Sequence, residues 1–181
     1  GETITQAVKT AYEIGYRHFD TAEMYGNESD IGKALAELPR EEIFITSKLW
    51  MDNYDNESAK QACYRSLERL QTEYLDLYLI HWPQENTDYE ELFKALKELQ
   101  DEGKIKSVGV SNFTVGHLER ILPVARNVGL QIVVNQVEFH PYLYQKNLLE
   151  YCKERNIAVT AYSPLAQGKI VGEAVLRNIA Q

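Results

Sequence analysis

The sequence of 181 residues has only two cysteines, no long apolar run and fewer basic than acidic side chains. Cys63 and Cys152 do not belong to a C-x-x-C motif, so neither a disulfide framework nor a zinc knuckle is predicted. No stretch approaches the roughly 20 apolar residues that span a bilayer, and the first ten residues lack the apolar core of a signal peptide. We therefore expect a cytoplasmic protein that does not contact membranes.

The charge balance also excludes partners. Lys and Arg number 19 against 27 Asp and Glu, which gives a net charge of −8. Such a chain lacks the clustered basic side chains that bind phosphates, so we expect no nucleic-acid partner. The four histidines show no H-E-x-x-H pairing, and no metal site is expected. The composition is that of one soluble globular domain, which we expect to be a monomer.

Short β-branched and aromatic runs alternate with longer amphipathic stretches. The runs that predict buried parallel strands are 17–22, 42–50, 74–82, 105–112, 132–140 and 157–165. The stretches that predict helices include 57–71, 89–100 and 144–155. Thr87 and Glu90 form a capping-box pattern before the second of these helices, and Gly103 is a plausible stop after it.

This alternation, without a G-x-G-x-x-G turn, favours an α/β fold of the (β/α)8 TIM barrel type over a Rossmann sheet. About six of the eight strands are represented. Polar residues follow the apolar runs, as expected where strand ends form a barrel's active site. These are Asp20, Lys48, His81, Ser111 with Asn112, Gln136 with Glu138, and Tyr162 with Ser163.

Lys48 closes a predicted buried strand, and a buried ammonium needs a partner. Asp20, at the end of a neighbouring strand, is the obvious one. The pair is either a structural salt bridge or a charge that tunes a nearby acid. Tyr25 follows on the loop after Asp20, where it could be a general acid helped by Lys48, or an aromatic lid residue.

His81 is either a core histidine or a hydrogen-bond donor to a carbonyl oxygen on which negative charge develops. Trp50 and Trp82 would then form an apolar wall for a substrate, although isolated tryptophans are more often packing residues.

Six ordered motifs together resemble the signatures of the aldo-keto reductase superfamily, over essentially the whole chain. They are D-T-A-E-M-Y-G-N-E, I-T-S-K-L-W, L-I-H-W-P, G-V-S-N-F, N-Q-V-E-F-H-P and A-Y-S-P-L-A-Q-G. The resemblance places the family's catalytic tetrad on Asp20, Tyr25, Lys48 and His81. It implies that Tyr25 donates a proton, that Lys48 and Asp20 tune it, and that His81 orients the carbonyl. The branch it suggests contains prokaryotic 2,5-diketogluconate, methylglyoxal and aldehyde reductases.

The same resemblance implies residues that bind the cofactor. Ser111, Asn112 and Gln136 match those that hold the nicotinamide carboxamide, and Tyr162 matches the aromatic residue that stacks on the ring. Ser163, Leu165 and Gln167 lie on the loop that passes along the pyrophosphate in the family. NADPH is the cofactor implied by the family, and NADH is not excluded.

The expected function is therefore the NADP-dependent reduction of a small aldehyde or ketone. Two alternatives remain open: a barrel that binds cofactor without catalysis, as an interaction or structural subunit, and an inactive truncated form. Because six strand candidates are found where a barrel has eight, we expect residues 1–181 to be a single barrel domain that is incomplete at both ends.

Overall fold

Six parallel strands form one sheet, in the order in which they occur along the chain. The computed structural model describes residues 2–181. The strands are β1 (His18–Asp20), β2 (Phe44–Leu49), β3 (Leu75–Ile80), β4 (Ile105–Ser111), β5 (Ile132–Glu138) and β6 (Ala158–Tyr162). All six predicted strands are therefore confirmed.

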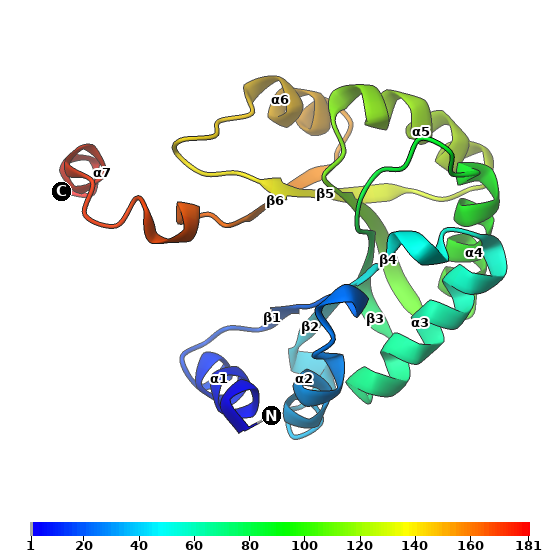
Figure 1. Ribbon diagram of the computed structural model, residues 1–181, viewed down its shortest axis with the longest axis horizontal. Coiled ribbons are helices and arrows are strands. Elements are labelled where there is room, and N and C mark those ends of the chain that lie inside the picture. The colour runs from blue at the N-terminus through cyan, green and yellow to red at the C-terminus, as the bar shows by residue number, and fades with distance from the viewer. Residues whose placement is uncertain (1) are drawn as a thin grey trace.

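Most of the helices connect the strands and line the outside of the curved sheet, whereas the last helix follows the sixth strand and lies away from the sheet (Figure 1). They are α1 (Glu2–Glu13), α2 (Glu28–Leu35), α3 (Asn56–Leu70), α4 (Tyr89–Asp101), α5 (Val115–Asn127), α6 (Lys146–Glu154) and α7 (Ala174–Ile179). The predicted helices 57–71, 89–100 and 144–155 correspond to α3, α4 and α6. The arrangement is a curled half-barrel with helices on its convex side, which agrees with the predicted barrel class.

Side chains alternate across each strand, so one residue faces the helices and the next faces the concave side of the sheet. On β2, the Ser47 hydroxyl donates to Glu28 on α2, whereas the next residue, Lys48, bonds to Asp20 on the concave side. Apolar residues that face the helices form the core, including Ile45, Tyr78 and Ile80. The polar side chains of the concave side are thereby held on a rigid, buried framework.

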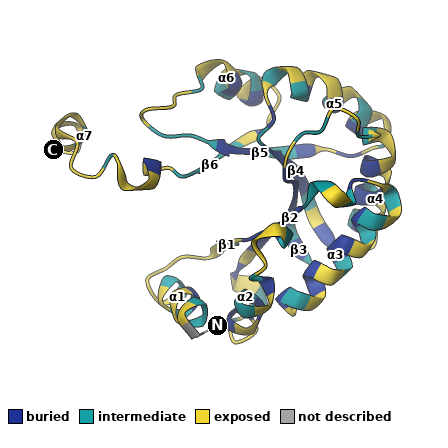
Figure 2. Ribbon diagram, viewed as in Figure 1, coloured by how far each residue is buried: buried dark blue, intermediate teal, exposed yellow. Residues whose placement is uncertain are grey.

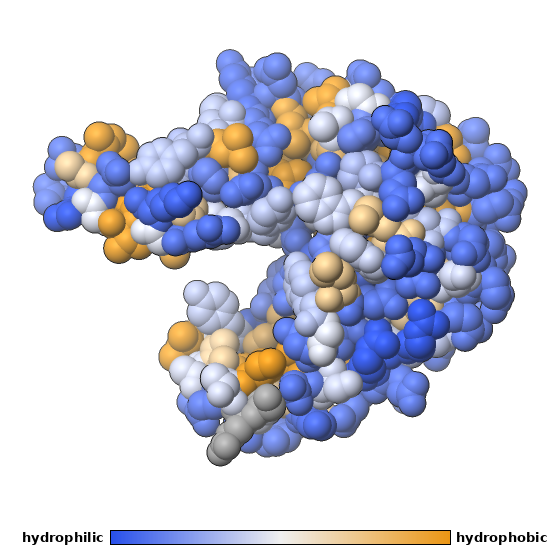
Figure 3. Space-filling view, in the orientation of Figure 1, coloured by the Kyte–Doolittle hydropathy of each residue, from blue (hydrophilic) through white to orange (hydrophobic). Residues whose placement is uncertain are grey.

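Burial is concentrated in the middle of the sheet. Figure 2 shows β2 to β5 and the inner sides of α3 and α4 largely buried, whereas β1 and α7 are mostly exposed. The space-filling view shows a notch between the α1 end of the molecule and the segment after β6 (Figure 3). Val171, Val175 and Ile179 on that segment are exposed and apolar.

The cap of α4 differs from the sequence prediction. Asp88, and not Thr87, is the N-cap, because its Oδ1 accepts from the backbone N–H groups of Glu90 and Glu91 at 3.1 and 3.2 Å. The Thr87 hydroxyl is buried without a hydrogen-bond partner among the described residues. Gly103 does follow the helix end, at φ 74°, a conformation that favours glycine.

Gly32 allows α2 and α3 to approach closely. A Cβ atom at this position would collide with the backbone of Arg69 and Leu70. Any larger residue at this position would therefore push α2 and α3 apart. Within residues 2–181, the helices are all too short or too polar to cross a membrane.

Candidate active site

Lys48 is the centre of a cluster at the carboxyl ends of β1 and β2. Its side chain is 1% exposed, and its ammonium bonds to the Asp20 carboxylate and to the Thr21 carbonyl oxygen at 2.9 Å. A third bond, of 3.4 Å, joins Lys48 Nζ to the phenol oxygen of Tyr25. Tyr25 itself is 51% exposed. The residue therefore contacts the buried ammonium through its hydroxyl group and is also accessible from the concave side.

His81 follows β3 and completes the predicted tetrad. Its ring lies edge-on to Tyr25, with centroids 5.7 Å apart, and edge-on to Trp50 at 5.2 Å. Burial, together with the Lys48 charge, lowers the pKa of His81 to about 4, although Asp20 opposes this shift. The imidazole is therefore neutral near neutral pH. Its Nδ1 atom is buried without a partner among the described residues.

Gln136 joins the two sides of the curved sheet. Its side-chain nitrogen, on β5, donates to Asp20 Oδ2, on β1, at 2.7 Å. The two carboxylate oxygens of Asp20 thus have different partners: Lys48 on one and Gln136 on the other. This arrangement fixes the orientation of the carboxylate beside the ammonium.

A second polar cluster surrounds Asn112, at φ 66° after β4. Its Nδ2 donates to the His81 carbonyl oxygen at 3.0 Å and to Ser111 Oγ at 3.1 Å, and its Oδ1 accepts from the Tyr162 hydroxyl at 2.9 Å. Ser111 Oγ also donates to the Gln136 carbonyl oxygen at 2.9 Å. Burial, followed by the charge of Glu138, raises the pKa of Tyr162. The structure thus brings four predicted cofactor residues next to the tetrad.

The side chains of the other predicted residues form no hydrogen bond with this cluster among the described residues. Ser163, Leu165 and Gln167 occupy the loop after β6, and Leu165 is 59% exposed. Trp82 is 41% exposed, and its backbone is bonded to the Tyr54 hydroxyl. Trp50, in contrast, contacts His81. Only one of the two predicted wall tryptophans therefore has a ring contact with the tetrad in the described part of the chain.

Two carboxylates anchor the loop that bears Tyr25, and sequence reasoning did not single them out. Glu23 accepts hydrogen bonds from the Trp50 backbone N–H and from the Asn53 amide. Glu28 is 1% exposed and accepts from Ser47, at 2.6 Å, and from Arg69, at 2.7 Å. Their position inside the D-T-A-E-M-Y-G-N-E motif was the available signal.

Both cysteines are free and buried, Cys63 on α3 and Cys152 on α6. Across residues 2–181, no group of three or more His, Cys, Asp or Glu side chains is placed to hold a metal ion. The polar groups at the strand ends are therefore a set of proton donors, acceptors and one buried cation.

Residues 2–180 match the model of the Aldo/keto reductase family. The chain is 47% identical over 183 residues to the glyoxal reductase of Bacillus subtilis (strain 168), covering 100% of this chain and 65% of that protein. It is 44% identical to methylglyoxal reductase DkgA of Escherichia coli (strain K12), covering 99% of this chain and 65% of that protein.

Solved structures are similar as well. An aldo/keto reductase from Brucella melitensis has a TM-score of 0.90 at 42% identity, covering 98% of this chain and 68% of that one. The aldose reductase from Schistosoma japonicum has a TM-score of 0.89 at 38% identity, covering 99% of this chain and 66% of that one. The chain spans about 65% of the length of the two bacterial reductases.

Proposed function

This chain belongs to the aldo/keto reductase family, and from that premise we propose that it carries the catalytic part of an enzyme that reduces a small aldehyde or ketone with a nicotinamide cofactor. One observation carries the proposal. A buried ammonium, Lys48, bonds at once to Asp20 and to the hydroxyl group of Tyr25, beside a neutral His81.

Tyr25 is the proposed proton donor. Its phenol is half exposed on the concave side, where a small molecule can reach it, while Lys48 Nζ lies 3.4 Å from its oxygen. When the phenol gives its proton to a carbonyl oxygen, the ammonium stabilises the phenolate that remains. Asp20 keeps the ammonium in place, and Gln136 keeps Asp20 in place.

His81 is proposed to orient the carbonyl. As a neutral imidazole it carries a single N–H, which donates to the same carbonyl oxygen and stabilises the charge that develops there. The Trp50 ring, in edge contact with His81, provides an apolar wall for the substrate. When bound, the nicotinamide supplies the hydride that reaches the carbonyl carbon.

The residues present fit a nicotinamide in kind and place. A half-buried aromatic ring, Tyr162, is bonded to the Asn112 amide, which is bonded in turn to the His81 backbone. Ser111 and Gln136 add a hydroxyl and a further amide beside the tetrad. We propose that these four residues hold the nicotinamide, and that Ser163, Leu165 and Gln167 lie along the pyrophosphate. NADPH is the proposed cofactor, with NADH as the competitor in the same assay.

Small 2-oxoaldehydes are the proposed substrates, because two of the relatives are a glyoxal reductase and a methylglyoxal reductase. The first assay follows the loss of reduced cofactor absorbance with glyoxal and methylglyoxal. Oxidation of the cofactor by these aldehydes is the expected result. Binding of cofactor without turnover over a panel of aldehydes would contradict the proposal.

Tyr25→Phe tests the role of the phenol. We expect kcat to fall by about 10²- to 10⁴-fold, the usual contribution of a general acid, while cofactor binding, measured by nicotinamide fluorescence, is unchanged. Tyr64→Phe is the matched control, because Tyr64 bonds to Glu102 on the outer helices, away from the tetrad. An unchanged rate in Tyr25→Phe would remove Tyr25 from the mechanism and leave the family assignment intact.

A further inference from the structure

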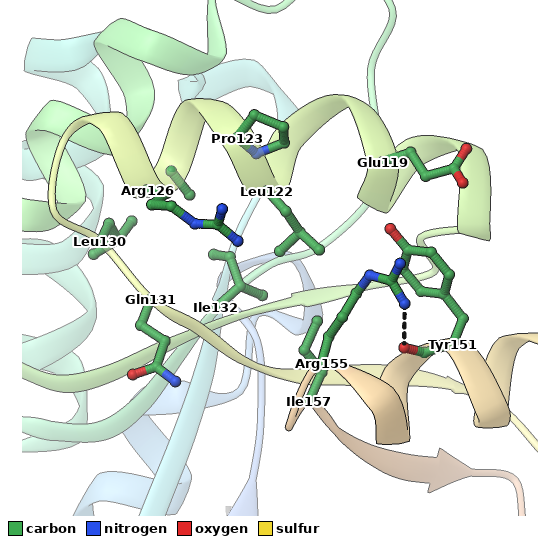
Figure 4. A pocket seen from close by; sticks show the side chains of 11 residues that line it. Glu119, Leu122, Pro123, Arg126, Leu130, Gln131, Ile132, Tyr151, Arg155 and Ile157 are labelled. Carbon is green, nitrogen blue, oxygen red and sulfur yellow. Dashed lines mark hydrogen bonds between the residues drawn. The ribbon is translucent and has the colours of Figure 1, made fainter.

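A pocket lies at the end of the sheet opposite the tetrad. It opens between α5 and α6, with a volume of about 430 Å³ (Figure 4). Its lining includes Ile132, the first residue of β5, and Ile157, which directly precedes β6. Gln136 and Tyr162, in contrast, lie toward the opposite ends of these two strands. The pocket is therefore separate from the candidate active site, and its size is within the usual range for small-molecule sites.

The floor of this pocket is apolar. Leu130, Ile132 and Ile157 are each at most 4% exposed, and Leu122 on α5 lies beside them. Figure 4 shows Ile132 and Ile157 low in the view, with Leu122 between the side chains of Arg126 and Arg155. A surface of this kind favours an aliphatic group, because burial of apolar area is the main gain on binding.

The two arginines are Arg126, from α5, and Arg155, directly after α6. Arg155 is held in place: its guanidinium lies 3.6 Å from the centroid of the Tyr151 ring, and its Nη1 donates to the Tyr151 carbonyl oxygen at 3.2 Å. The same Nη1 is paired with the Glu154 carboxylate at 3.3 Å. The bond to a carbonyl oxygen in the last turn of α6 is an ordinary role for a cation at a helix end.

Arg126 has no such role. Within residues 2–181 its guanidinium has neither a hydrogen bond nor an ion pair, although it extends over the apolar floor (Figure 4). Glu119 is the single acidic residue of the lining, and its carboxylate points away from Arg126. Because Arg155 is already paired with Glu154, Arg126 is the cation of the lining that has no anionic partner among the described residues, on a chain whose net charge is −8.

We propose that this pocket binds a small monocarboxylate with an aliphatic body. The carboxylate would accept hydrogen bonds from Arg126 and from the free nitrogens of Arg155, since guanidinium groups bind carboxylates in a planar, often bidentate geometry. The aliphatic body would cover Leu122, Ile132 and Ile157. Its single negative charge would be neutralised by Arg126, the unpaired cation of the lining within residues 2–181.

The test is a titration with hexanoate, followed by NMR of labelled Leu and Ile methyl groups. We expect saturable shifts centred on Leu122, Ile132 and Ile157. The neutral isostere hexanamide should bind at least about tenfold more weakly than hexanoate, because it lacks the charge that strengthens the hydrogen bonds. The measurement needs neither cofactor nor turnover, so it is independent of the proposed catalytic function.

Variants give the decisive comparison. Arg126→Ala and Arg155→Ala should each weaken hexanoate binding about tenfold. Arg120→Ala is the matched control, because it removes the same charge from the same helix at a residue outside the lining, and it should bind as the wild type does. Circular dichroism establishes that each variant is folded.

Three results would overturn the proposal. The first is the absence of shifts at the pocket. The second is a set of shifts around Leu49 and Leu79, near the tetrad, that Arg126→Ala leaves unchanged, which would mean that the carboxylate binds at the active site. The third is equal affinity for hexanoate and hexanamide, which would mean that the arginines do not recognise the charge.

Discussion

At the scale of single residues, Lys48 shows how a charge is kept inside this protein. Its side chain is almost completely buried, and an ammonium without partners would rather lose its proton than stay there. Three oxygens surround it, from Asp20, Thr21 and Tyr25. The charge is therefore retained on a buried ammonium whose partners Asp20 and Tyr25 are themselves open to small molecules.

His81 leads to a prediction about pH. Its pKa is about 4 in the folded protein, against an ordinary value of 6.5. Between these two values the unfolded chain binds more protons, so acidification favours unfolding, and this contribution to stability is present above about pH 6.5 and lost as the pH falls toward 4. Relative to His81→Gln, the wild type should therefore lose stability between about pH 7 and about pH 5. Urea unfolding of both proteins at each pH measures the difference.

Because groups distant from His81 contribute equally in both proteins, the comparison isolates the imidazole and its interactions with Lys48 and Asp20. A wild type that keeps a constant stability difference from His81→Gln over this range would mean that the imidazole has the same pKa in the folded and unfolded states, which would contradict the lowered pKa.

At the scale of elements, α3 connects to both ends of the loop that bears Tyr25. Arg65 pairs with Glu23 before Tyr25, and Arg69, one helical turn later, pairs with Glu28 after it. The position of the phenol thus depends on the packing of α3 against β2 and α2, and Gly32 permits the close approach that this requires.

Glu28→Gln is expected to destabilise the protein by about 2–3 kcal/mol, because it removes the charge from a buried carboxylate that is bonded to Ser47, Ser66 and Arg69. Equilibrium unfolding in urea provides the value. Glu57→Gln is the control, on α3, the helix that bears Arg69; its side chain is 71% exposed, and the change should alter stability by less than about 0.5 kcal/mol. Equal effects of the two changes would show that the loop is not anchored through Glu28.

The cap of α4 supplies a second prediction at this scale. Asp88→Ala should destabilise the protein by about 1 kcal/mol, since two backbone N–H groups lose their acceptor. Thr87→Ala should have a smaller effect, because the Thr87 hydroxyl has no partner to lose among the described residues. Thermal unfolding measures the destabilisation caused by each variant. A larger effect of Thr87→Ala than of Asp88→Ala would show that Thr87 is the N-cap.

The sequence predicted much of the fold because strand and helix patterns are local. All six strands follow from apolar runs, and the polar residues at their ends indicated the site. The cap was displaced by one residue because Thr87 and Asp88 are both good caps and only backbone geometry distinguishes them. Glu28 was missed because an acid in the first turn of a helix usually faces water, and its partner Arg69 is 41 residues away in the sequence.

At the scale of the whole molecule, the sheet has two kinds of strands. β3 and β4 have a partner on each side, whereas β1 pairs only with β2, and β6 only with β5, within residues 2–181. Unpaired edges leave backbone groups open to water and to other chains. Stability is therefore expected to be highest in the middle of the sheet and lowest at its margins.

Hydrogen exchange measures this gradient. Amide groups of β3 and β4 should exchange at least about 100-fold more slowly than those of β1 and β6, since the central strands open only with the whole sheet, whereas the margins open locally. Mass spectrometry of peptides from each strand gives the rates. Uniform exchange across the six strands would show that the sheet opens as one unit.

The bond between Gln136 and Asp20 also has a consequence for the order of folding. The two residues are 116 positions apart, so the bond forms only after the three intervening strands, β2 to β4, and the four intervening helices, α2 to α5, have been laid down. Contacts this distant are made late, because a long loop must first be closed. The proposed proton-transfer site is therefore completed near the end of folding. A newly synthesised chain that ends at β4 contains Lys48 and Asp20 but lacks Gln136, the amide that orients the Asp20 carboxylate.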